Sequence, residues 1–122
     1  MISDFDVLCK KVLEIDKNIR SARVINGVGR LIAGGMRKGV ESLEGLKKDE
    51  ILFMNLALEV KLRHDFDEEF GAVDFVVFYR GKIIIMSFPF NENVLYVSAE
   101  KQIVFKKIPF EILKIMDKQS SK

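Results

Sequence analysis

The sequence predicts an α/β sandwich of the α+β type, with three layers and helices on both faces of an antiparallel five-stranded sheet. Two observations favour this fold. Residues 72–99 hold three β-branched and aromatic runs, whose side chains pack well on a pleated sheet. These runs are apolar on both faces, whereas a sheet solvated on one side would alternate more cleanly. We therefore expect the order helix, two strands, helix, three strands, helix.

Length and composition are typical of one globular domain. The chain has 122 residues, 48% hydrophobic and 31% charged, so residues 1–122 are expected to bury one core. The net charge of +2 is too small to predict a nucleic-acid partner. No run of about 18 apolar residues predicts a membrane span. The single cysteine, Cys9, and an amino terminus without signal-peptide character favour a reducing, cytoplasmic location.

The first two elements are a helix and a hairpin. Ser3 and Asp6 form a capping pattern, and an apolar stripe then recurs at helical spacing up to Asn18: Phe5, Leu8, Val12 and Ile15, with Cys9 beside it. Residues 21–25 and 30–33 are predicted strands around a glycine-containing turn at residues 26–29. Gly34 and Gly35 lie where we expect the second strand to end, and residues 37–45 form a crossing loop.

The hairpin glycines do not fit a phosphate-binding loop. Gly29 and Gly34 have the spacing of a P-loop, but Gly35 and Met36 stand where Lys and Ser or Thr are needed. Ile32 stands at the third glycine position of the dinucleotide fingerprint. We interpret these glycines as turn residues and expect no cofactor.

The second helix, predicted over residues 46–66, carries apolar side chains on two opposite sides. One stripe consists of Ile51, Met54, Leu58 and Leu62, and the other of Phe53, Leu56, Ala57 and Val60. A helix that is apolar nearly all round is normally buried on two sides. One stripe can lie on the chain's own sheet, so the other needs a second partner. The alternative is a cover within the chain, by residues 37–45 or 66–70.

The carboxyl-terminal part is predicted as three strands and a helix. The strands are residues 73–79, 82–88 and 94–99, and Pro89 is expected to stop the second. Residues 103–105 fit either a short strand or the approach to the last helix. Pro109 suits the first turn of that helix.

With these elements the chain resembles the roadblock/dynein-light-chain family of profilin-like and longin-like sandwiches, and also short uncharacterised archaeal proteins of this build. The resemblance covers nearly the whole chain, through the hairpin at 22–33, the three strands at 73–99 and the segment 98–101 that leads to the last helix. It implies a non-enzymatic scaffold or regulatory protein, dimeric with itself or a paralogue. Many such dimers bind or regulate small Ras-like GTPases, so the resemblance makes a GTPase the expected partner.

Members of that family dimerise through the second helix and the first strand of the three-strand unit. Carried onto this sequence, the resemblance places the dimer interface at Phe53, Leu56, Ala57, Val60, His64, Asp74, Val76 and Phe78.

Other candidate groups do not assemble a catalytic or metal site. His64 is the only histidine, the acids after it lack a calcium-loop spacing, and Cys9 fits a small buried residue. We therefore expect no enzyme. The acids at 65–69 are unusual at a helix carboxyl end, so either the helix ends near His64 or they bind a basic partner.

The alternative function is that of a small-ligand sensor. Profilin-like sandwiches can open a pocket between sheet and helix, and such pockets are mostly apolar. Four aromatic residues are candidates to line one: Phe75, Tyr79, Phe88 and Tyr96.

Overall fold

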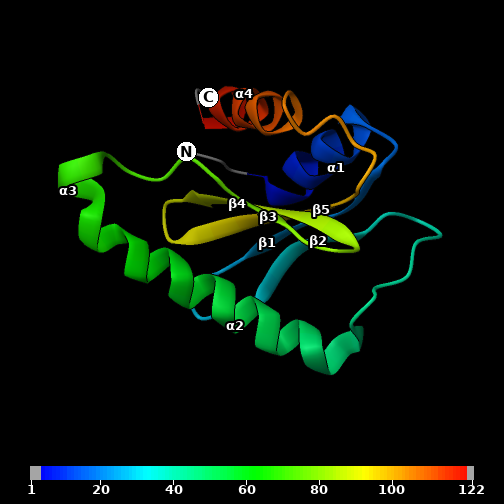
Figure 1. Cartoon of the computed structure of the whole chain (residues 1–122), viewed down its shortest axis with the longest axis horizontal. Coiled ribbons are helices and arrows are strands. Elements are labelled where there is room, and N and C mark those ends of the chain that lie inside the picture. The colour runs from blue at the N-terminus through cyan, green and yellow to red at the C-terminus, as the bar shows by residue number, and fades with distance from the viewer. Residues whose placement is uncertain (1–3, 121–122) are drawn as a thin grey trace.

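The computed structural model describes residues 4–120 and confirms the predicted fold class and order of elements. The strands are β1 (Ile19–Ile25), β2 (Leu31–Met36), β3 (Val76–Tyr79), β4 (Ile83–Phe90) and β5 (Asn93–Glu100). The helices are α1 (Phe5–Ile15), α2 (Gly45–Arg63), the short η1 (His64–Phe66) and α3 (Asp67–Phe70), and α4 (Ile108–Ser120). The sheet is antiparallel in the order β2-β1-β5-β4-β3. Helices α1 and α4 cover one face and α2 the other (Figure 1).

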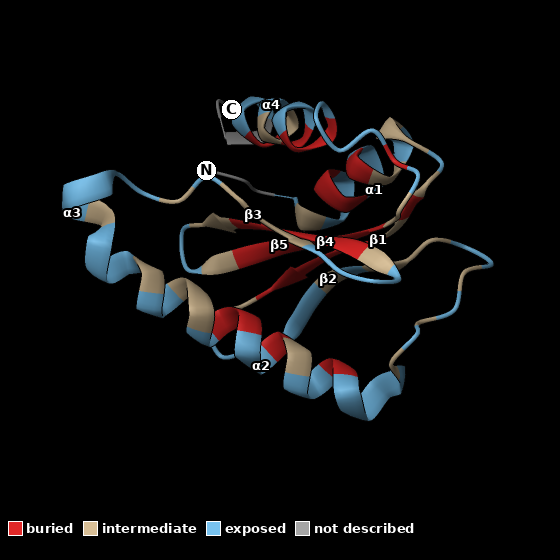
Figure 2. Cartoon of the chain, in the orientation of Figure 1, coloured by how far each residue is buried: buried red, intermediate tan, exposed pale blue. Residues whose placement is uncertain are grey.

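The larger core lies between the sheet and the α1–α4 layer. Alternate residues of the three central strands point into it, including Val24, Met86 and Val97, and they meet Leu8 and Val12 of α1. Each fully buried aliphatic side chain contributes roughly 1.5–3 kcal/mol. A smaller cluster lies under α2, so buried residues occupy both faces of the sheet (Figure 2).

Helix α1 begins with an aspartate cap. The Asp4 carboxylate accepts a hydrogen bond from the backbone nitrogen of Val7 at 3.1 Å, which satisfies one free amide of the first turn. The cap predicted at Ser3 lies outside the described residues. The helix ends at Ile15, earlier than the predicted Asn18, because the backbone becomes extended at Asp16.

Two predicted boundaries of the carboxyl-terminal strands were wrong. Strand β4 continues through Pro89, which pairs with Val94 of β5. The two-residue turn after Phe90 makes Phe90 and Asn93 a hydrogen-bonded pair. The backbone nitrogen of the preceding residue, Pro89, therefore points away from β5, toward the side of β4 on which β3 lies. On that side β3 reaches only as far as Ser87, and no ladder hydrogen bond is lost. Strand β3 itself begins at Val76, later than predicted, and residues 103–105 form turns that lead into α4.

Strand β2 also runs further than predicted, through Gly34 and Gly35 to Met36. Gly34 has φ +82, and a Cβ built there would collide with the carbonyl oxygen of Ala22 and lie 2.7 Å from the sulfur of Cys9. Glycine is therefore needed at this position because α1 and β1 approach the strand too closely for any side chain.

We predict that Gly34→Ala lowers the free energy of unfolding by about 2 kcal/mol or more, through backbone strain and the collision with Ala22. Gly35→Ala is the matched control, since a Cβ there meets nothing within 4 Å and should change stability by less than about 1 kcal/mol. Urea denaturation of both variants measures the difference. Equal stability losses would contradict the assignment of close packing to Gly34.

Candidate functional site

Helix α2 buries one of its apolar stripes and exposes the other. Phe53, Leu56 and Ala57 are 3–5% exposed, and the first two belong to the cluster with Ile25, Ile85 and Tyr96 on the sheet. The opposite stripe is Ile51, Met54, Leu58 and Leu62, hereafter the outer stripe, whose members are 55–61% exposed (Figure 2). The two stripes exist as predicted. Their roles are reversed relative to the expected interface, because three of the residues assigned to it pack inside the chain.

The other residues assigned to the interface lie along or near α2 and β3. Val60 is partly buried, and Val76 and Phe78 are half-buried on β3. Asp74 is exposed just before that strand. His64 is exposed, and its Nδ1 lies 2.7 Å from Oδ2 of Asp67. That these five residues contact a second copy of the chain remains a prediction.

Two grooves lie between α2 and the part of the sheet that ends in the open edge of β3. Strand β3 pairs with β4 on one side and with no described strand on the other. A groove of about 150 Å³ joins the carboxyl half of α2, at Val60 and His64, to Val76 at the start of β3. A groove of about 570 Å³ joins the amino half, at Ile51, to the β3–β4 turn. Helix α2, which packs on β5, is thus separated by grooves from the start of β3 at one end and from the β3–β4 turn at the other.

The larger groove has an apolar floor and a basic rim. Its floor includes Leu52, Ile83, Ile85 and Tyr96. The exposed Lys48, Arg80 and Lys82 stand at its border. The β3–β4 turn is held in place because Lys101 donates to the carbonyl of Arg80 at 2.6 Å and lies 3.7 Å above the ring of Tyr79.

A buried charged cluster fixes the amino half of α2 on the sheet. Arg23 of β1 and Asp49 of α2 are both buried, with Nη1 3.3 Å from Oδ2. The Arg23 guanidinium also lies 5.4 Å from the ring centres of Phe53 and Tyr96. Burial raises the pKa of Asp49 to about 6, and a hydrogen bond to Glu44 is the second largest cause of this shift. Burial alone would raise the pKa of Glu44, but hydrogen bonds from Asp49 and Ser42 leave it below its usual value.

Below about pH 6 the two carboxyl groups therefore share a proton. Oε2 of Glu44 and Oδ1 of Asp49 are buried and have no ordinary donor among the described residues. A proton on Asp49 supplies the missing donor and leaves one negative charge to balance Arg23. This cluster was not predicted from the sequence, although an arginine in an apolar strand and an aspartate on the inner side of α2 were signals for it.

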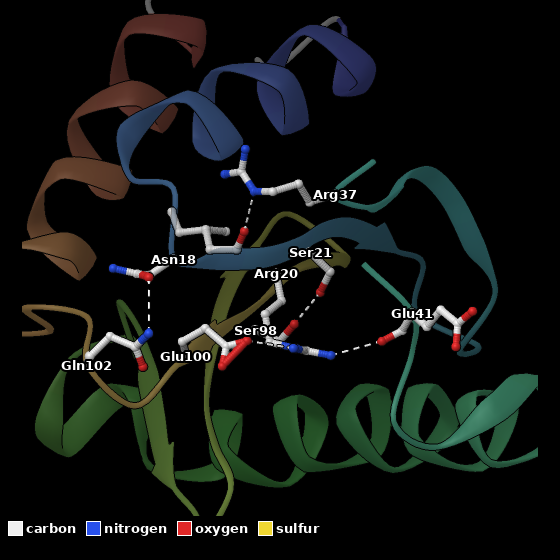
Figure 3. Close-up of polar contacts among 9 residues, drawn as sticks. Asn18, Arg20, Ser21, Arg37, Glu41, Ser98, Glu100 and Gln102 are labelled. Atoms are coloured by element: carbon white, nitrogen blue, oxygen red, sulfur yellow. Dashed lines mark hydrogen bonds and ion pairs between the residues drawn. The ribbon is translucent and has the colours of Figure 1, made fainter. Parts of the chain in front are cut away.

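Two further arginines hold the loop at residues 37–44 that leads into α2 (Figure 3). Arg37 donates to the carbonyl of Ile19 at 2.7 Å and to that of Asp16, at the end of α1, at 2.9 Å. Arg20 bridges Glu100 at 2.6 Å and the carbonyl of Glu41 at 2.8 Å. The start and the middle of the loop are thus tied to the end of α1 and to the sheet.

The comparisons with known proteins agree with this geometry. A model described as "Family of unknown function (DUF6659)" matches residues 1–122. The chain belongs to this family. No curated protein matches the sequence.

Among solved structures, the chain is similar to the Roadblock/LC7 domain from Streptomyces avermitilis, with TM-score 0.73, 14% identity, and coverage of 98% of this chain and 97% of that one. It is also similar to the gliding protein MglB from Thermus thermophilus (TM-score 0.72, 9% identity, 94% and 87% covered). A third similar structure is MglC from Myxococcus xanthus (0.65, 12%, 96% and 97%). The roadblock-like fold of this DUF6659 member is therefore established.

The aromatic residues proposed to line a ligand pocket do not share one. Phe88 and Phe75 pack against each other, with ring centres 5.8 Å apart, on the side of α1 and α4. Tyr96 lies on the opposite face against Phe53. Tyr79 is exposed beside Phe105. The prediction of a common pocket was wrong because Phe88 pairs with Leu95, and Tyr96, the next residue of β5, points to the opposite face.

The remaining candidate groups have structural roles in this DUF6659 chain. A Cβ at Gly29 would lie 2.7 Å from the Cα of Met54, so the hairpin turn packs on α2 and φ +85 there requires glycine. Burial, with the nearby Asp6, raises the pKa of the Cys9 thiol to about 12 and makes it a poor nucleophile. Within residues 4–120, no three histidine, cysteine or acidic side chains cluster as metal ligands, and no helix is long and apolar enough to cross a membrane.

We predict that the free energy of unfolding decreases on the order of 1 kcal/mol as pH rises from 4.5 to 7, because of Asp49. Its folded pKa of about 6 exceeds the ordinary 3.8, so the folded chain keeps a proton that the unfolded chain releases. This stabilisation is complete below pH 3.8 and is lost as pH passes 6. Glu44 acts in the opposite sense only below its ordinary pKa of 4.5.

Urea denaturation across this pH range measures the effect in the wild type and in Asp49→Asn, which should lose this part of the slope. Glu50→Gln, at an exposed neighbour, should keep it. An unchanged slope in Asp49→Asn would contradict the shared proton.

Proposed function

We propose that this chain is a non-enzymatic, dimeric scaffold or regulatory protein of roadblock type that binds a protein partner, namely a small Ras-like GTPase. The outer stripe of α2 carries the dimer proposal. Four large apolar side chains, 55–61% exposed, lie on one side of one helix. Leaving such side chains in water forgoes roughly 1–3 kcal/mol each, and a contiguous apolar patch of this kind marks an interaction site.

No segment of the chain's described part shields the outer stripe from solvent. The loop at 37–44 and the segment at 64–70 leave its members exposed, and Phe66 and Phe70 of that segment are themselves exposed. Cover has to come from another molecule.

The open edge of β3 supports a second copy of the chain as that molecule. Unpaired strand edges favour pairing with another strand. An antiparallel β3–β3 pair across a two-fold axis would continue the sheet and set the two α2 helices side by side on the same face, with the Ile51 side of each outer stripe toward the other copy. Such an isologous contact buries the same patch on both copies and closes without further growth.

The proposal of a GTPase partner rests on the roadblock resemblance and the roadblock-like fold. The open grooves beside α2, two of which lead to β3 and the β3–β4 turn, favour a binding role. The cytoplasmic location stays a prediction.

We predict that the wild type has twice its chain mass of 14.0 kDa in solution, and that Leu58→Glu is monomeric because it places a charge at the centre of the outer stripe. Sedimentation velocity measures the mass, and circular dichroism shows whether the fold is kept. Val104→Glu, at an exposed apolar residue before α4, is the matched control and should stay dimeric. A wild type that remains monomeric at high protein concentration would refute the dimer.

We predict that the dimer binds at least one small Ras-like GTPase of its source organism, with different affinity for the GDP and GTP-analogue forms. Affinity purification from that organism, followed by calorimetry with each recovered GTPase, tests this. Partners that never include a GTPase, in an organism that encodes suitable ones, would count against the regulatory role and leave the dimer untouched.

A further inference from the structure

We infer that the acidic segment His64–Phe70 of one copy docks into the basic-rimmed groove between α2 and the β3–β4 turn of a second copy. The segment comprises η1 and α3, and the groove is the one of about 570 Å³ described above. This inference rests on the proposed dimer and adds a specific, reciprocal contact to it.

The acidic segment has the features of a ligand for an apolar groove. Phe66 and Phe70 are 56% and 82% exposed and stack on each other, with ring centres 5.8 Å apart. Glu68 and Glu69 beside them are exposed, and neither forms an ion pair with a described residue. Two exposed aromatic rings flanked by carboxylates without an ion-pair partner are complementary to a surface that is apolar in its centre and basic at its border.

The groove offers that combination. Its floor of Leu52, Ile83, Ile85 and Tyr96 can receive aromatic rings. Its rim carries Lys48, Arg80 and Lys82, while Glu44, which also lines it, is already engaged with Asp49. Lys47 and Lys48 stand in the first turns of α2, where the helix dipole disfavours cations and where a neighbouring anion would be stabilised.

A segment and its own groove lie too far apart to meet. In Figure 1, α3 is at the left end of the molecule, whereas the β3–β4 turn and the start of α2 are at the right end. The acidic segment and the basic rim therefore lie at opposite ends of the long axis. Only another molecule can bring the two ends together.

The proposed two-fold axis brings the acidic segment of each copy to the basic rim of the other copy. It places the two α2 helices side by side and antiparallel. With the axis near the middle of α2, the carboxyl half of each helix lies beside the amino half of the other. The residues that follow Arg63 then reach the amino half of the other α2, where the groove begins. Each copy thus donates one segment and receives one.

Charge reversal tests this docking. One variant, Glu68→Lys with Glu69→Lys, makes the segment basic, and the other, Arg80→Glu with Lys82→Glu, makes the groove rim acidic. Each alone should raise the dimer dissociation constant at least about tenfold, because like charges then face each other. An equimolar mixture should form a heterodimer with an affinity well above that of either variant alone, since its contact between the two reversed surfaces again joins opposite charges.

Controls separate this docking from general charge effects and from misfolding. Glu14→Lys with Glu111→Lys reverses two exposed charges on the α1–α4 layer and should leave the dissociation constant unchanged. Lys48→Glu changes the rim without altering the β3–β4 turn, and should also be rescued by the basic segment. Circular dichroism and thermal unfolding confirm that each variant folds.

The outcomes distinguish the two proposals. Charge-reversed variants that dimerise like the wild type would overturn the docking and leave the dimer standing. A monomeric wild type would overturn both. Variants that dimerise normally but lose GTPase binding would assign the groove to the GTPase and likewise overturn the docking.

Discussion

A helix that lies on a sheet can bury only one side against it, and in this chain α2 is apolar on two. This constraint governs the whole α2 layer. The cluster around Phe53 and Leu56 holds the helix to the sheet, while Ile51, Met54, Leu58 and Leu62 remain in solvent. The α1–α4 layer is different, because two helices share that face and the larger core is closed within one chain. A large unsatisfied apolar surface therefore remains on α2, beside grooves that lead to the start of β3 and to the β3–β4 turn.

The ion pair between Arg23 and Asp49 decides which side of α2 faces the sheet, more than the apolar area that either stripe could bury. Both stripes are apolar and similar in size, so burial alone distinguishes them poorly. Asp49 lies on the same side as Phe53 and Leu56, and it is the partner of the buried Arg23. Turning the helix over would leave Arg23 charged and unpaired under an apolar surface, at a cost of several kcal/mol. A buried ion pair that adds little net stability can in this way select one of two packings.

This explains what the sequence could and could not predict. The order of elements, both α2 stripes, the hairpin turn and the role of Pro109 follow from local periodicity and turn chemistry. Which stripe faces inward depends on Arg23 and Asp49, which lie in different elements and meet only in the folded chain. The need for glycine at Gly34 depends on contacts with Ala22 and Cys9, and the tolerance of Pro89 depends on where β3 ends. Each of these errors thus came from a contact between distant segments.

The distribution of charge also bears on why two copies, and no more, would assemble. The net charge is only +2, but the charges are unevenly distributed: the acidic segment lies at one end of the long axis and the basic groove at the other. Contact through these ends alone would be head-to-tail and could continue indefinitely. In the proposed dimer the two α2 helices would instead lie side by side and antiparallel. This arrangement would satisfy both segments and both grooves at once, so no complementary end would remain for a third copy.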